Sequence, residues 1–120
     1  MTSGKEEKEI FLKMYVAAVR SGLIAKLGPK NWTTLCVIAS HMNEKRQCYP
    51  TQSQIAKGLG VSRQTANKYV NDLLAFRWEG KPVIRSIKDR DEHGRWDNTR
   101  YTIMSVSCLA IFKSDQVNGD

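Results

Sequence analysis

Hydrophobic positions in the middle of the chain follow two helical repeats that are separated by a glycine. The apolar side chains lie three or four positions apart, first at Ile55, Ala56 and Leu59, and then at Ala66, Val70, Leu73 and Leu74. Gly60 lies where the first helix must end, because glycine adopts a left-handed backbone at little cost. Val61 supplies an apolar residue for the turn, and Ala56 is small enough for a close helix crossing. Two such helices predict a helix-turn-helix.

The residues at the two helix starts agree with this register. Thr51 and Gln54 have the spacing of a capping box, in which each side chain binds the backbone of the other residue. Ser62 precedes the second helix, where its hydroxyl can accept a hydrogen bond from a free backbone N–H group. An ordinary pair of bundle helices is the alternative. The agreement among caps, glycine and turn residue favours the helix-turn-helix.

The polar face of the second helix has the composition of a DNA-reading surface. Glutamine and asparagine, which recur on this face, suit the edge of adenine, and Arg63 at the helix start suits guanine or a phosphate. A helix of this kind docks in the major groove of DNA. The residues of this helix that we expect to contact DNA are Ser62, Arg63, Gln64, Thr65, Asn67, Lys68 and Asn71.

The hydrophobic pattern changes after the second helix from a helical to an alternating period. Residues 79–82, Glu-Gly-Lys-Pro, predict a turn, and residues 83–87 and 99–106 predict two strands. A polar loop, 88–98, joins the strands. A hairpin that directly follows a helix-turn-helix predicts a winged helix.

The loop of this hairpin is basic at Lys88, Arg90 and Arg95. We expect these side chains to reach the DNA backbone or the minor groove beside the second helix. Acidic residues such as Asp89 and Asp91 alternate with them, so a solvated loop without DNA contacts is the alternative.

The segments before the helix-turn-helix predict further helices. Apolar positions between residues 10 and 19 follow an amphipathic helical pattern, and Pro29 suits the first turn of a helix that continues over 31–42. The short apolar segment 23–27 has no assigned state. Residues 48–50, Cys-Tyr-Pro, are short enough for an edge strand that the proline ends.

The predicted fold is α+β and mainly α. It is a winged helix-turn-helix, with a three-helix core, a C-terminal β-hairpin wing and an extra N-terminal helix. We expect a helical extension over 1–27, the DNA-binding domain over 28–107, and a tail or the start of a linker over 108–120. The apolar segment 108–112 either continues the second strand or begins a helix that packs on the first one. This segment and the N-terminal helix either mediate a homodimer or cover the monomer's own core.

The amino-acid composition limits the classes of binding partner that we expect. The chain has 120 residues, a net charge of +7 and a pI near 9.5, which favours a polyanion, and nucleic acid before a membrane surface. The opening residues are polar, and no apolar run approaches the roughly 20 residues of a membrane span. We therefore expect a cytoplasmic protein without a membrane partner. Phosphate-binding, zinc-hydrolase and nucleophile motifs are absent from the sequence, so we expect no enzyme activity.

Three cysteines, Cys36, Cys48 and Cys108, are an odd number without a paired spacing. In the cytoplasm we expect reduced thiols. A metal site that combines Cys36 and Cys48 with His41 and His93 is conceivable, but these residues lack metal-ligand spacing. The prediction is that the protein holds no metal and no cofactor.

Two segments of the chain, 22–43 and 48–76, resemble a known family. The second carries a winged-helix motif at Tyr49-Pro50-Thr51, Ile55-Ala56, Leu59-Gly60-Val61-Ser62 and Thr65. It resembles the N-terminal winged-helix domains of plasmid and phage replication initiators of Gram-positive bacteria, of the replisome-organiser and DnaD-like type. The resemblance covers roughly residues 10–107. It implies a domain that recognises an origin, and a helicase or helicase loader as partner only through a C-terminal region that this sequence does not contain.

The leading functional interpretation is therefore sequence-specific binding of double-stranded DNA in replication initiation. A transcriptional repressor with the same docking geometry is the alternative, because repressors share much of the motif. A winged helix used only for protein assembly is a third class, and the acid-poor face of the second helix argues against it.

Overall fold

The computed structural model of the protein describes residues 9–90, 93 and 96–114, and gives the backbone alone for residues 89, 90, 96–98, 113 and 114. Over these residues it has five α-helices: α1 (Ala17–Arg20), α2 (Leu23–Leu27), α3 (Pro29–Ala39), α4 (Gln52–Leu59) and α5 (Arg63–Ala75). Its strands are β1 (Glu9–Met14), β2 (Gln47–Cys48), β3 (Arg77–Trp78), β4 (Lys81–Pro82), β5 (Ile84–Arg90), β6 (Trp96–Ile103) and β7 (Leu109–Ser114).

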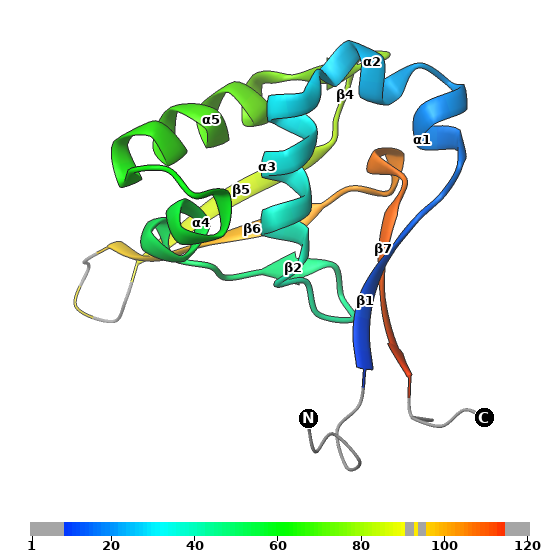
Figure 1. The fold of residues 1–120 in the computed structure, drawn as a ribbon. Coiled ribbons are helices and arrows are strands. Elements are labelled where there is room, and N and C mark those ends of the chain that lie inside the picture. Colours follow the sequence, from blue (N-terminus) through cyan, green and yellow to red (C-terminus); the bar gives the residue numbers. More distant parts are fainter. Residues whose placement is uncertain (1–8, 91–92, 94–95, 115–120) are drawn as a thin grey trace.

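Helices α3, α4 and α5 pack together on one side of a small antiparallel sheet (Figure 1). The sheet has the strand order β2-β6-β5. Its inner face and the helices share one hydrophobic core, in which the largest fully buried side chains include Ile38, Ile55, Leu73, Tyr101 and Ile103. This mixture of helices and strands is compatible with a winged helix-turn-helix.

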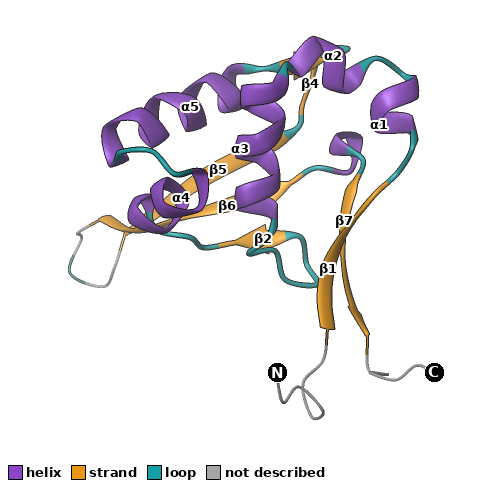
Figure 2. Cartoon of the chain, in the orientation of Figure 1, coloured by secondary structure: helices purple, strands orange, loops and turns teal. Residues whose placement is uncertain are grey.

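Strands β5 and β6 form the predicted hairpin after α5, and Figure 2 shows it extending past α4 and α5. The register pairs Ile84 with Ile103 and Lys88 with Thr99, so the ladder continues into the segment that we expected to be loop. At the other end β6 ends earlier than predicted, since a 3-10 turn occupies Ser105–Ser107. The predicted edge strand exists, since β2 pairs with β6 through Cys48 and Tyr101, but it begins at Gln47 and ends before Tyr49.

The predicted helix over residues 10–19 is wrong. Residues 9–14 form strand β1, and only the single turn α1 follows. β1 pairs antiparallel with β7 in a separate two-stranded ribbon, and the Phe11 and Phe112 ring centroids lie 5.0 Å apart. A short run rich in apolar residues fits both periods, so a pairing partner at the far end of the chain decides its state.

Segment 108–112 belongs to the ribbon, so neither predicted alternative describes it. Cys108 has a left-handed backbone with φ 65°, which separates β7 from the strand before it. Leu109 is buried in the main hydrophobic core and anchors one end of the ribbon there. The rest of the ribbon extends away from the helices (Figure 1). The segment 23–27, which had no assigned state, is helix α2, and Pro29 is confirmed in the first turn of α3.

Arg46 fastens the ribbon to the sheet, a role that the sequence pattern did not indicate. Its guanidinium donates hydrogen bonds to three backbone carbonyls, those of Ile103, Met104 and Leu109, at the end of β6 and the start of β7. Its own carbonyl accepts a hydrogen bond from Ile103 N at 2.9 Å. The backbone of Arg46 is left-handed, with φ 66°, a conformation that non-glycine residues adopt at an energetic cost.

Candidate nucleic-acid interface

The start of α4 has the geometry that the capping box predicts. Gln54 N donates to Thr51 Oγ1 at 3.1 Å, and Thr51 N donates to Gln54 Oε1 at 2.8 Å. The helix ends at Gly60, which has a left-handed backbone with φ 73°. Both ends of α4 are therefore fixed by local interactions, which sets the direction in which the chain enters the turn.

The start of α5 is held in the same way. Ser62 Oγ accepts a hydrogen bond from Thr65 N at 3.1 Å and donates one to Thr65 Oγ1 at 3.0 Å. Both hydroxyls thus take part in the helix cap, and Thr65 is half-buried. Of the predicted contact residues, these two position the helix start in the structure.

The other predicted residues of α5 share its exposed surface. The apolar residues Ala66, Val70 and Leu73 are buried against α3, α4 and the sheet. The opposite surface carries exposed side chains, which we call the α5 polar face: Arg63, Gln64, Asn67, Lys68 and Asn71. Because the first turn of α5 holds no acidic residue, nothing in it repels a phosphate.

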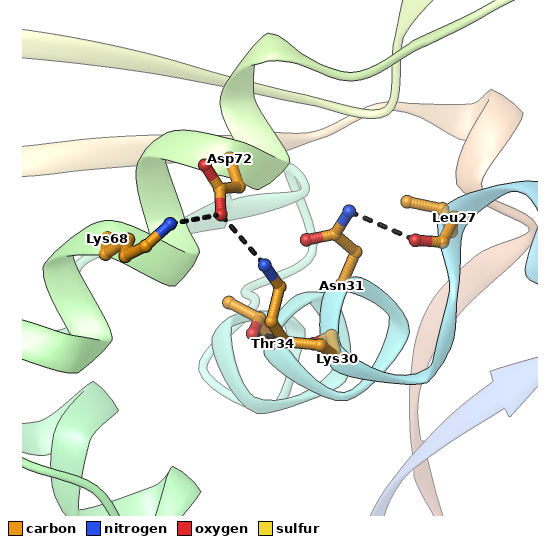
Figure 3. A network of polar contacts seen from close by, with 6 residues as sticks. All are labelled: Leu27, Lys30, Asn31, Thr34, Lys68 and Asp72. Carbon is orange, nitrogen blue, oxygen red and sulfur yellow. Dashed lines mark hydrogen bonds and ion pairs between the residues drawn. The ribbon is translucent and has the colours of Figure 1, made fainter.

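The α5 polar face has an acidic neighbour on the side toward α3. Asp72 Oδ2 lies 2.8 Å from Lys30 Nζ and 3.5 Å from Lys68 Nζ (Figure 3). The Lys30 ammonium also lies over the Tyr69 ring, 5.0 Å from its centroid. The hydrogen bond from Lys30, together with the charges of Lys30 and Lys68, holds the pKa of the Asp72 carboxyl below its usual value. The sequence interpretation included Lys68 and missed both Asp72 and the second lysine of the cluster, Lys30.

The structure describes only some of the hairpin residues that we expect to contact DNA. Lys88 is exposed near the end of β5, where its backbone pairs with Thr99 of β6. Arg90 ends β5, and its side chain lies outside the described residues, as does the whole of Arg95. Exposed Arg85 lies on the same strand and adds a basic group that the sequence interpretation did not include.

Residues 25–78 match the sequence profile of a family described as a helix-turn-helix domain. Within these residues, α4, the turn at Gly60 and α5 form a helix-turn-helix. The match runs from within α2 to β3, so it includes the whole α5 polar face and ends before the β5–β6 hairpin. No curated protein and no solved structure is significantly similar to the chain. A helix-turn-helix supports DNA binding, with α5 in the position of the helix that enters the groove.

The cysteines and histidines do not assemble in the structure. Among the residues that the structure describes, no three histidine, cysteine or acidic side chains come together as a metal site. Burial raises the pKa of the Cys48 thiol to about 12, so this thiol is neutral at physiological pH. Within the described ranges, no helix has the length and apolar character to cross a membrane.

Gly58 permits the close approach of α4 to α3, and the sequence interpretation missed it. A Cβ atom on Gly58 would lie 2.8 Å from Val37 Cγ1, inside van der Waals contact. Valine has few rotamers, so its methyl group cannot easily move aside. Gly58 therefore sets the spacing of the helix-turn-helix against α3.

We expect Gly58→Ala to destabilise the protein, although alanine favours helices over glycine by about 1 kcal/mol. Overpacking against Val37 costs about 1–3 kcal/mol, which outweighs the gain. Urea unfolding of the single variant and of the Gly58→Ala/Val37→Ala pair measures this. A single variant as stable as the wild type would contradict the contact. With the contact present, the pair loses less stability than the two single changes summed.

Proposed function

We propose that the protein binds double-stranded DNA in a sequence-specific manner, with α5 in the major groove and the β5–β6 hairpin acting as a wing. The observation that carries this proposal is the exposed α5 polar face, which presents Gln64 and Asn67 beside Arg63 on a helix with a fixed start. Planar amides of this kind form paired hydrogen bonds with adenine, whereas lysine and arginine on the hairpin suit phosphates. In this function the protein binds its target and has no catalytic role.

For the biological process we propose origin recognition in plasmid or phage replication initiation. The support is the motif that begins at Tyr49-Pro50-Thr51 and its resemblance to replication initiators. In that role a helicase or its loader would be recruited by a further C-terminal region. A transcriptional repressor is the second candidate, since the same helix-turn-helix serves both. Selection of binding sites from random oligonucleotides separates them: tandem direct repeats support the initiator, and a single palindrome supports the repressor.

The first test is the salt dependence of DNA binding. We expect the logarithm of affinity to fall linearly with the logarithm of salt concentration, by about 0.9 for each phosphate that the protein neutralises. Fluorescence anisotropy with a labelled random duplex between 50 and 200 mM salt measures the slope. Affinity that does not change over this range would contradict the proposed function and would favour an assembly module.

We also propose that the β1–β7 ribbon joins two copies of the protein. Its exposed apolar side chains include Ile10, Phe11 and Phe112, with 59%, 45% and 48% of their surface accessible. An isolated two-stranded ribbon has little stability in water, and a second copy would supply further strands and cover these side chains. The monomer covers only part of the ribbon itself, through Leu109 and the half-buried Leu12 and Ile111.

Sedimentation equilibrium tests the dimer across protein concentrations, with and without DNA. We expect a dimer mass for the wild type and a monomer mass for Phe112→Glu, because a charge is costly to bury in an apolar interface. Tyr49→Glu serves as the matched control, since Tyr49 is half-exposed and lies outside the ribbon. A monomer mass for the wild type at all concentrations would exclude the dimer.

A further inference from the structure

Asp72 is the acidic residue that pairs with the basic groups beside the α5 polar face. It lies one turn after Lys68, and its carboxylate oxygen binds two ammonium groups, from Lys68 on the same helix and from Lys30 on α3 (Figure 3). The Lys30 bond is the shorter of the two, 2.8 Å against 3.5 Å. Asp72 thus connects the N-terminal turn of α3 to the third turn of α5.

On the Lys30 side, the cluster has a second contact besides the ion pair. The Lys30 ammonium lies against both Asp72 and the face of the Tyr69 ring, and cation–π contact favours this position. The Lys30 carbonyl accepts a hydrogen bond from Thr34 Oγ1 at 2.9 Å, within α3. Lys68 has 71% of its side chain exposed, so its ammonium is free to exchange between Asp72 and another anion.

The cluster changes how much charge the helix-turn-helix offers to DNA. Two lysines without the carboxylate would present two positive charges at this edge of α5, whereas the cluster of Lys30, Lys68 and Asp72 presents one. Affinity for any DNA sequence grows with the number of phosphates neutralised, while the base contacts of Gln64 and Asn67 require the matching sequence. A carboxylate at this place therefore lowers binding to all DNA and leaves the base contacts intact.

We propose that Asp72 is a positioning residue that sets the selectivity of DNA binding: it holds Lys30 and Lys68 away from phosphates on random DNA. The inference rests on the proposed function. On a matched site the amide contacts fix the backbone beside α5, so a phosphate placed there competes with Asp72 for Lys68. On random DNA no contact fixes that phosphate, and both lysines stay with the carboxylate. Discrimination is obtained by weakening the wrong complex.

The test compares the wild type with Asp72→Asn on the selected site and on a random duplex. We expect Asp72→Asn to bind random DNA more tightly, with a salt slope steeper by about 0.9 for each lysine released. At 50 mM salt the gain on random DNA should exceed the gain on the selected site, so the ratio of the two affinities falls. Asp72→Glu keeps the charge and should behave as the wild type.

A second pair of variants separates selectivity from folding. Asp72→Asn also removes a link between α3 and α5, and Lys30→Met removes that link without freeing a positive charge. A purely structural role predicts a loss of stability in both variants and tighter binding of random DNA in neither, whereas the proposed role predicts tighter binding and steeper salt dependence in Asp72→Asn alone. Circular dichroism of each variant reports any loss of helix.

The outcomes test the role of Asp72 and the proposed DNA binding separately. If the wild type binds with a steep salt dependence while Asp72→Asn leaves both the slope and the affinity ratio unchanged, the role of Asp72 is overturned and DNA binding stands. If the wild type shows no salt-dependent binding, the proposed function falls and the role of Asp72 falls with it.

Discussion

Asn67→Ala is expected to cost about 1–3 kcal/mol of binding free energy on the selected DNA site and much less on random DNA. The amide of Asn67 lies exposed on the α5 polar face, next to Gln64 in the turn before it, and the helix beneath them is fixed at its start by Ser62. A bidentate amide contact depends on the base, so its loss weakens only the matched complex. Gln64→Ala is expected to behave in the same way.

Lys88→Ala is the matched control for these variants. Its ammonium suits a phosphate, so its removal should weaken binding to both DNAs alike and lower the salt slope by about one unit. Each variant also needs a circular dichroism spectrum, because a change near the helix start can act through the cap: removal of the Ser62 hydroxyl costs about 1 kcal/mol. If the Gln64 and Asn67 variants discriminate between the two DNAs as well as the wild type, the α5 polar face does not read bases.

Arg46→Ala is expected to lower the free energy of unfolding by about 2–4 kcal/mol. Hydrogen bonds from a charged group contribute about 1.5–3 kcal/mol each, and Arg46 makes three to backbone carbonyls from a half-buried position. Because the bonds share one side chain, their contributions do not add in full. Urea unfolding followed by circular dichroism measures the loss.

The backbone of Arg46 offers a second comparison at the same site. Arg46→Gly removes the same hydrogen bonds as Arg46→Ala, but glycine adopts the left-handed backbone without steric cost. We therefore expect Arg46→Gly to be more stable than Arg46→Ala by about 1 kcal/mol. Lys45→Ala, at the exposed neighbouring position, should change stability by less than about 0.5 kcal/mol. An Arg46→Ala variant with wild-type stability would show that the ribbon does not depend on the guanidinium.

The helix-turn-helix was predictable because its signals are local. The capping box of Thr51 and Gln54, the left-handed Gly60 and the Ser62 cap each act within four residues, and the structure has all of them. The apolar repeat of α5 likewise predicted which side of the helix is buried. The assignment of the exposed side to DNA contacts stays a prediction, which the family match supports at the level of the domain.

The features that the sequence did not reveal depend on residues far apart in the chain. β1 was mistaken for a helix because its partner β7 lies at the other end of the described chain. The sequence analysis assigned no role to Asp72, because its stronger partner Lys30 comes from α3. Arg46 and Gly58 have no sequence signature for the same reason: the carbonyls and the methyl group that they meet belong to other elements.

The pairing of β1 with β7 has a consequence for how the protein is made. During synthesis β1 leaves the ribosome before every element that separates it from β7, so β1 has no partner until β7 has emerged. Helices α3 to α5 pack on one another and lie between β1 and β7, so they can form on the nascent chain before the ribbon, whereas a pairing between distant segments must wait and forms slowly. For that interval an apolar strand is exposed with both edges unpaired, which is the condition under which chaperones bind and chains aggregate. The Arg46 guanidinium then acquires the last of its acceptors, at Leu109, as the ribbon closes.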